Sequence, residues 1–245
     1  MAPLTRRSAY LNGLLVGGTV VMCLVVCLHT AASNVAVFEE AVLAGGLEGV
    51  GLRHVVRADL LAAAEVAGGL TAAIVAETGA ALVGLCAGAD AVLLTCSTLG
   101  PAAAVAAVGA AVPILRVDAA LADEVARDGG TVVVLCAAGT TVGPTRELFE
   151  AAARGTGAVV RVAVVEGAWA AFRAGDRTLY LNLIAAAAEA ALRGGAVRVA
   201  LAQASMAGAC SLVCEPGRVL GSPVAGLRAA VAGCAGDAAG RHNLG

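Results

Sequence analysis

The sequence predicts an α/β protein whose sheets are parallel. Short apolar runs alternate along the chain with Ala-rich stretches, and Gly-Gly pairs at 68–69, 129–130 and 194–195 separate several of them. That alternation is typical of strands joined by crossover helices. The runs, such as Val20 to Val26, are apolar throughout rather than at every second residue. Continuous runs of this kind indicate strands that are buried on both faces of a sheet.

The expected elements follow one another along the chain. In the first half we expect strands at 19–28, 52–57, 90–95 and 112–117, with helices at 35–45, 59–66, 71–87 and 101–109. The last of these helices begins at Pro101, and proline is favourable in a first helical turn. In the second half we expect strands at 131–136, 158–165 and 196–202, with helices at 118–128, 144–154, 167–174 and 177–193. A strand at 218–223 and a helix reaching Cys234 complete the pattern.

The layout of strand ends repeats along the chain. The strand that ends at His29 has a counterpart at 131–136, which Thr140 follows, and the strand before Cys96 has a counterpart before Ser205. We therefore expect two pseudosymmetric, doubly wound parallel-sheet lobes with a cleft between them, because ligands of open α/β sheets bind at the carboxyl ends of strands. The expected division is 1–18 as an N-terminal extension, 19–117 plus 215–245 as lobe one, and 118–214 as lobe two.

The composition excludes several functions. The net charge is −2 and aromatic residues make up 2% of the chain, so neither a basic surface nor stacking platforms for nucleic acid are expected. All 16 cationic residues are Arg. Without Lys, no Schiff base forms, which excludes pyridoxal phosphate enzymes, and a Walker A loop is excluded as well.

The N-terminal region permits two interpretations. Arg6-Arg7 precedes an apolar stretch at 11–32, which resembles an export signal or a single membrane span. Alternatively, the run at 19–28 is the first buried strand, whose end supplies polar groups to the cleft. We favour the strand, and with it a cytoplasmic protein that has no membrane association.

The eight cysteines contain no Cys-x-x-Cys pair. Four of them lie within apolar runs and are expected in the core as reduced thiols, which agrees with a reducing compartment; these are Cys23, Cys27, Cys86 and Cys136. Cys23, Cys27 and His29 would share one face of a strand, but no fourth ligand is evident, so we expect no metal site.

The segment Thr95 to Pro101 carries the strongest chemical signal. Cys96 follows a buried strand and precedes a helix, whose N-terminal N–H groups and dipole favour the thiolate. Hydroxyl groups at several strand ends are suited to bind a carboxylate, although helix capping is the alternative role for each; they belong to Thr30, Ser33, Ser97, Thr98, Thr140, Thr141 and Ser205. A Cys96–His29 acyl-transfer pair stays open at this point.

Thr95-Cys96-Ser97-Thr98 resembles the first catalytic-cysteine motif of the aspartate/glutamate/hydantoin racemase superfamily. The resemblance extends, in order, through five further short motifs and covers roughly residues 19 to 232. These motifs are Leu28-His29-Thr30, Gly69-Leu70-Thr71, Val165-Glu166-Gly167-Ala168, Ala174-Gly175-Asp176 and Leu201-Ala202-Gln203-Ala204-Ser205-Met206. It implies two Rossmann- or flavodoxin-like lobes and cofactor-free proton transfer by two cysteines, one from each lobe.

This chain departs from the family pattern at the second cysteine. Where the family has Gly-Cys-Thr, the chain has Gln203-Ala204-Ser205, and Cys210 lies too far along to replace the thiol. Classical two-base racemisation therefore lacks one of its groups. Relatives with one cysteine, such as arylmalonate decarboxylases and maleate isomerase-like enzymes, are precedents for chemistry at Cys96 alone.

The resemblance therefore implies a cofactor-independent racemase or isomerase that acts next to the carboxylate of a small acid or amino acid. Cys96 is the expected acid/base or nucleophile, with Ser205 as the second catalytic residue. The expected substrate-binding residues are His29, Thr30, Ser97, Thr98, Thr140, Thr141 and Gln203. The alternatives are a single-cysteine decarboxylase, a cis–trans isomerase and a non-catalytic small-acid binding protein. We expect no cofactor, no nucleic-acid partner, and a homodimer as the possible assembly.

Overall fold

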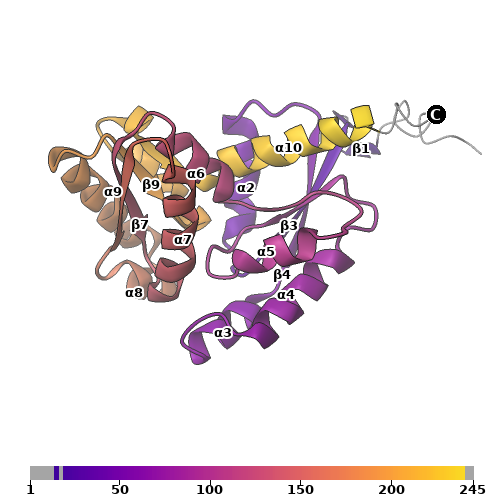
Figure 1. Cartoon of the computed structure of the whole chain (residues 1–245), viewed down its shortest axis with the longest axis horizontal. Helices are drawn as coiled ribbons and strands as arrows, with labels where there is room; N and C mark the ends of the chain where they lie inside the picture. Colours follow the sequence, from indigo (N-terminus) through magenta and orange to yellow (C-terminus); the bar gives the residue numbers. More distant parts are fainter. Residues whose placement is uncertain (1–13, 17–18, 241–245) are drawn as a thin grey trace, which may run out of the picture.

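The computed structural model describes residues 14–16 and 19–240, with side chains described from 22 to 234. Two four-stranded parallel sheets form two lobes that lie side by side (Figure 1). The first sheet contains β3 (Cys23–His29), β4 (Val50–Val56), β5 (Ala91–Leu94) and β6 (Ile114–Arg116). The second contains β7 (Gly130–Cys136), β8 (Ala158–Val164), β9 (Arg198–Leu201) and β10 (Val219–Gly221).

The two sheets have the same topology. Their strand orders are β4-β3-β5-β6 and β10-β9-β7-β8. In each lobe, the first strand along the chain therefore lies between the second and the third, which is the flavodoxin-like order. The expected pair of pseudosymmetric, doubly wound lobes is confirmed. In each lobe, the order in which the chain adds strands reverses direction between the first and third strands. Folds of this kind bind ligands at that point.

Helices cover the faces of both sheets, which explains the continuous apolar strands. The first lobe contains α2 (Asn34–Ala44), α3 (Ala58–Val66), α4 (Ala72–Gly84) and α5 (Pro101–Ala107). The second contains α6 (Ala119–Ala126), α7 (Val142–Ala153), α8 (Ala168–Arg173) and α9 (Arg177–Arg193), with 3₁₀ segments η1 (Gly139–Thr141), η2 (Ala204–Leu212) and η3 (Pro216–Arg218). All four residues of β5 are buried, so the strand before Cys96 has apolar neighbours on both faces.

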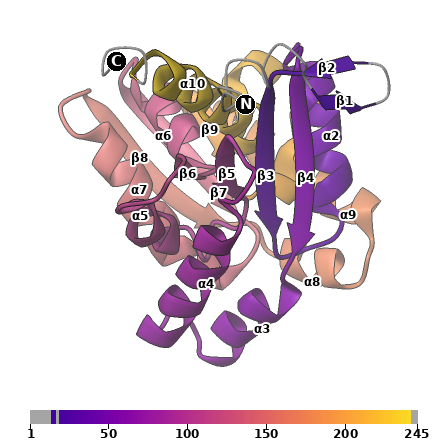
Figure 2. The same cartoon turned by 90° about the vertical axis from the view of Figure 1, so that its right-hand side faces the viewer.

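The first expected strand, 19–28, is split in the structure. Met22 is 72% exposed, and its backbone N–H donates to the carbonyl of Gly49 rather than continuing one strand. Before it, β2 (Thr19–Val21) pairs antiparallel with β1 (Leu14–Val16) as a hairpin beside the first sheet (Figure 2). Residues 1–13 and 17–18 of the expected extension lie outside the described residues. Among the described helices, none combines the length and apolarity needed to cross a membrane.

The end of the chain belongs to both lobes, whereas the sequence placed all of 215–245 in lobe one. The strand β10 pairs in parallel with β9 in the second sheet. The helix α10 (Ser222–Gly240) then runs back along the first lobe, where Leu227 and Ala230 pack among the buried residues of β3 and β5 (Figure 1). The reason is that one short strand completes the second sheet, while the apolar face of α10 covers the first.

One cysteine pair was not expected. Cys23 at the start of β3 and Cys234 in α10 form a disulfide that joins two segments 211 residues apart. Cys23 is buried, as predicted, but it is not a free thiol. The expectation that the core cysteines are reduced thus fails for this residue, which removes it from the argument for a reducing compartment. The free thiols are Cys27, Cys86, Cys96, Cys136, Cys210 and Cys214.

Candidate active site

Cys96 lies in the turn between β5 and α5. Two residues separate its strand, which ends at Leu94, from the turn at Ser97. The helix begins at Pro101, as predicted, so Cys96 lies before the first helical turn and not on it. Cys96 as a residue is 9% exposed. The groups that act on it therefore come from the turn and from the neighbouring strand end rather than from the helix.

Opposing influences act on the Cys96 thiol. Burial raises its pKa above the ordinary thiol value. The Thr30 hydroxyl and the backbone N–H groups of Leu99 and Thr98 lower the pKa, because each stabilises the thiolate by hydrogen bonding. Burial is the larger effect, so the resting group is a neutral thiol that has thiolate-stabilising donors already in place.

A cavity between the lobes contains Cys96. Its volume is about 30 Å³, which is little more than the space of a water molecule. A second hollow of about 130 Å³ adjoins it and shares Phe172 and Ser205 with it. Most of the lining comes from the ends of β3 and β5 in the first lobe and of β7 and β9 in the second, and α2, α3 and α8 add the rest. These four strands are the first and third of each lobe, so both topological reversal points face the cavity.

Seven of the nine predicted site residues line this cavity. They are Cys96, Ser205, Thr30, Ser97, Thr98, Thr141 and Gln203. The prediction is wrong for His29, which is fully buried and bonds to Thr95 and His54 instead. A His29–Cys96 pair is thus not formed. Thr140 does not line the cavity either; its hydroxyl lies 3.4 Å from that of Thr98.

Two of the hydroxyl groups connect the lobes. Ser97 Oγ donates a 2.6 Å hydrogen bond to the carbonyl of Ala202, and Thr98 Oγ1 lies 3.0 Å from Thr141 Oγ1. All of these groups are buried. Neither Ser97 nor Thr98 caps α5, whose N-cap is Gly100. These bonds fix the Cys96 turn against the second lobe and thereby set the position of the thiol in the cavity.

Side chains of the second lobe hold its strand ends in place. Gln203 Oε1 accepts hydrogen bonds from the backbone N–H groups of Ala137 and Ala138, at 2.6 and 3.1 Å. Gln203 thus shapes the loop after β7. Ser205 Oγ lies 2.8 Å from the hydroxyl of Tyr180, whose pKa burial raises. The Ser205 hydroxyl is therefore oriented by a neutral phenol and has no base beside it among the described residues.

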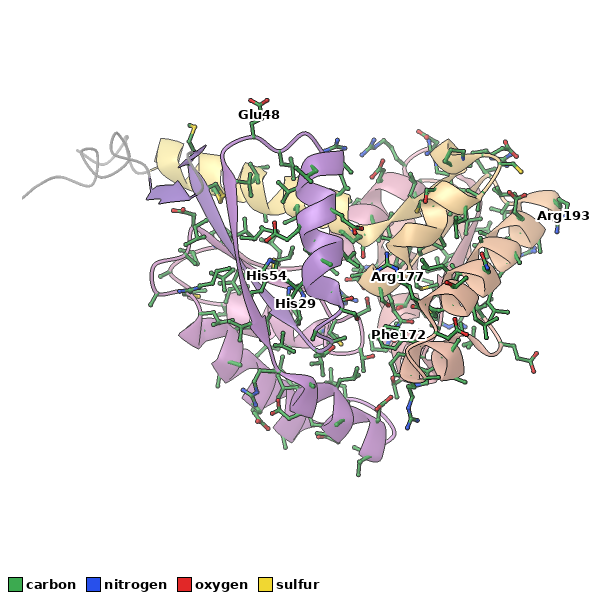
Figure 3. All side chains as sticks on the ribbon, turned by 180° about the vertical axis from the view of Figure 1, so that it is seen from behind. His29, Glu48, His54, Phe172, Arg177 and Arg193 are labelled. Carbon is green, nitrogen blue, oxygen red and sulfur yellow. A yellow bond between two sulfur atoms is a disulfide. The ribbon has the colours of Figure 1, made fainter. Side chains whose placement is uncertain are left out.

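The structure adds residues that sequence reasoning missed. Asn34, the first residue of α2, lines the cavity, and its Oδ1 is buried without a hydrogen-bond partner. Trp169 and Phe172 of α8 stack with their ring centroids 5.1 Å apart and form an apolar wall. Arg177 lines the adjoining hollow and lies on the side of the second lobe that faces the first (Figure 3). The only sequence signal for these residues was their place just after strands or motifs.

Ala204, the residue that the sequence resemblance aligns with a second cysteine, lines the cavity from the second lobe. Cys210 lines a different pocket, together with Gly208 and Pro216. Within the part of the chain that the structure describes, Cys96 is thus the one cysteine of this cavity. The site offers one thiol, several hydroxyl and backbone donors, an unpaired amide oxygen and an aromatic wall.

Comparison with solved structures identifies the class of fold. Allantoin racemase from Pseudomonas fluorescens matches with a TM-score of 0.59 and 18% identity, over 85% of this chain and 89% of that one. Aspartate racemase from Picrophilus torridus matches with a TM-score of 0.60 and 13% identity, over 84% and 93%. Arylmalonate decarboxylase matches with a TM-score of 0.57 and 14% identity, over 86% and 92%.

The chain therefore has the same two-lobe α/β fold as these two racemases and the decarboxylase. No protein-family model and no curated protein sequence matches it. At these identities the likeness concerns the fold, and the function has to be argued from the site.

Proposed function

We propose that the chain is a cofactor-independent enzyme of the isomerase or racemase type, which moves a proton on the carbon next to the carboxylate of a small acid or amino acid. Cys96 is the acid/base. The observation that carries this proposal is the position of Cys96, whose thiol lies in the interlobe cavity and meets the Thr30 hydroxyl and two backbone N–H groups. A thiol in such a setting can exist in both of the protonation states that proton transfer requires.

The polar lining supports binding of a carboxylate and of the enediolate derived from it. Hydroxyl groups of Thr30, Thr141 and Ser205 line the same cavity as the thiol. Donors of this kind stabilise negative charge as it develops on the substrate oxygens, and they do so without a lysine. Arg177 in the adjoining hollow is a cation for a second anionic group, and the Trp169–Phe172 wall suits an apolar substituent.

A second candidate is decarboxylation with protonation from one face. Two observations favour it: an alanine, Ala204, lines the cavity from the second lobe in place of a cysteine, and burial keeps the Cys96 thiol neutral. In that reaction the C–C bond of a malonate-type acid breaks, carbon dioxide leaves, and the electron pair stays on the substrate as an enediolate. The Cys96 S–H then donates its proton to the α-carbon, and solvent reprotonates the thiolate.

A panel of small acids in deuterated water tests both candidates. Amino acids, hydantoins, dicarboxylates and substituted malonates are incubated with the enzyme, and α-deuteration and released carbon dioxide are measured by mass spectrometry. We expect deuteration of at least one class, and its loss in Cys96→Ala but not in Cys136→Ala, a buried thiol of the second lobe. Tight binding of an acid with neither deuteration nor carbon dioxide release would instead indicate a non-catalytic binding protein.

A further inference from the structure

A buried cluster of one cysteine and two histidines lies in the first lobe, outside the cavity of Cys96. Cys27 and His29 are two residues apart on β3, so their side chains lie on the same face of the sheet. His54 on β4 pairs with Cys27 in the register of the two strands. The potential ligand atoms of all three lie within 4.8 Å of one another. Figure 3 shows the two histidines side by side.

The hydrogen bonds around the cluster fix the outer nitrogen of each histidine as a donor. Thr95 Oγ1 donates to the carbonyl of Leu28 at 3.1 Å, so His29 Nδ1, 2.8 Å away, must donate to the Thr95 oxygen. Glu39 Oε1 lies 3.0 Å from His54 Nε2. A carboxylate accepts hydrogen bonds, so His54 Nε2 carries a proton too.

With both outer nitrogens protonated, the two inner nitrogens keep their lone pairs. His29 Nε2 and His54 Nδ1 face each other at 2.8 Å. Two lone pairs at this separation repel unless a proton lies between them, as in an N–H···N hydrogen bond. A tetrahedral ion with Zn–N bonds of about 2.0–2.1 Å would replace this proton and hold the two nitrogens about 3.3 Å apart, so the rings would move apart by roughly half an ångström. The Cys27 sulfur converges on the same point and has no hydrogen-bond partner among the described residues. The Cys27 sulfur would be a third ligand for a metal ion, whereas a proton shared by the two histidines has no use for it.

We propose that Cys27, His29 and His54 bind a divalent metal ion of the zinc class. Cysteine and histidine are the ligands that zinc prefers, and the fourth tetrahedral position is left to solvent. The outer hydrogen bonds match those around metal-bound histidines, in which the second ring N–H donates to a carboxylate or another acceptor. Here Glu39 accepts the hydrogen bond from His54, and Thr95 accepts the one from His29.

The proposed ion lies outside the cavity of Cys96. None of its three ligands lines the cavity of Cys96, so the ion does not reach the reacting carbon. Instead it joins β3 to β4, and through Glu39 it joins both strands to α2. An ion can enter from the His54 side, because the side chain of His54 is 14% exposed while Cys27 and His29 are fully buried.

Metal uptake by the untagged full-length protein tests the proposal. The protein is demetallated with a chelator, dialysed against Zn²⁺ or Co²⁺, and analysed for metal content by mass spectrometry. We expect one ion per chain, a higher melting temperature with Zn²⁺, and a thiolate-to-Co²⁺ charge-transfer band with Co²⁺. The band should be lost in Cys27→Ser and kept in Cys136→Ser, a matched control at a fully buried thiol of the second lobe.

A surface variant keeps the test independent of folding. Glu39 is exposed, so Glu39→Gln leaves the core intact. Loss of this outer carboxylate should weaken Zn²⁺ affinity about 10- to 100-fold. A demetallated wild-type protein that takes up no stoichiometric Zn²⁺ or Co²⁺ would overturn the proposal and leave a shared proton between the histidines. A Co²⁺ band that survives in Cys27→Ser would overturn it as well.

Discussion

Cys96 and Ala204 line the same cavity from opposite lobes, each just after the third strand of its own sheet. Cys96 is the second residue after β5, and Ala204 is the third residue after β9. The two lobes therefore present different groups to the cavity, a thiol from the first lobe and a methyl group from the second. In the proposed reaction, one face of the α-carbon would meet the thiol, and the other would meet the methyl group of Ala204 beside the Ser205 hydroxyl.

Cys96→Ala should lower the turnover rate by about 10²- to 10⁴-fold, because a positioned acid/base is removed. The substitution keeps the buried site apolar and small, so the fold should survive, as circular dichroism would show. The control is Cys136→Ala, which removes an equally buried thiol that is not in the cavity. Near wild-type turnover in Cys96→Ala would contradict the account, as would an equal loss in the control.

The rate of deuterium exchange should increase with pH across the neutral and alkaline range. Exchange needs the Cys96 thiolate as a base, and burial raises the pKa of this thiol, so the thiolate is the minor form at neutral pH. Thr30→Val removes a hydroxyl group that lowers this pKa, and the inflection should move to higher pH. Thr141→Val, which alters another hydroxyl of the same cavity, serves as the control. An unmoved inflection in Thr30→Val would count against the proposed contact.

Ser97→Ala should lower the free energy of unfolding by about 1–3 kcal/mol, because it leaves the buried carbonyl of Ala202 without its donor. The comparison is Ser211→Ala, where an exposed hydroxyl loses a local bond to the carbonyl of Gly208 and the change should stay within about 0.5 kcal/mol. Urea unfolding of both variants measures the difference. Equal effects would mean that the interlobe bond adds nothing to stability.

Gly226→Ala should destabilise the contact of α10 with the segment that joins the lobes. A Cβ atom at Gly226 would lie 2.7 Å from the carbonyl oxygen of Val117 and 2.8 Å from its Cγ2. Overpacking of this kind costs about 1–3 kcal/mol. Gly143→Ala in α7 meets no atom within 4 Å, and it should be neutral or stabilising by up to about 1 kcal/mol. Thermal unfolding should separate the two variants, and a stable Gly226→Ala would show that α10 shifts freely.

Local patterns were sufficient to predict most of the fold. A strand such as β5 is four apolar residues followed by Thr95 and Cys96, and the change from apolar to polar marks the edge of the sheet. Because first and third strands of such lobes end side by side, the cavity residues could be predicted from their places in the chain. The orientation of side chains could not be predicted: the sequence pattern does not show that His29 points away from the cleft, towards His54.

Pairings between segments far apart in the sequence could not be predicted either. The three residues of β10 carry no signal that assigns them to one sheet or the other, so their pairing with β9 was missed. The disulfide between Cys23 and Cys234 joins segments 211 residues apart, and no local spacing reveals it. The register that brings His54 opposite Cys27 depends on strand pairing in the same way. Asn34 was missed because a polar residue at the start of a helix is ordinary in a sequence.

The most direct test of the central claim follows each enantiomer of a substrate by chiral chromatography in deuterated water. With Cys96 on one face and Ala204 on the other, we predict one-sided proton return, which gives stereoselective exchange or decarboxylation in place of full racemisation. Ala204→Cys supplies a thiol to the second face and should raise the racemisation rate. Equally fast interconversion of both enantiomers by the unmodified protein would contradict the account, because another group would then supply the second proton.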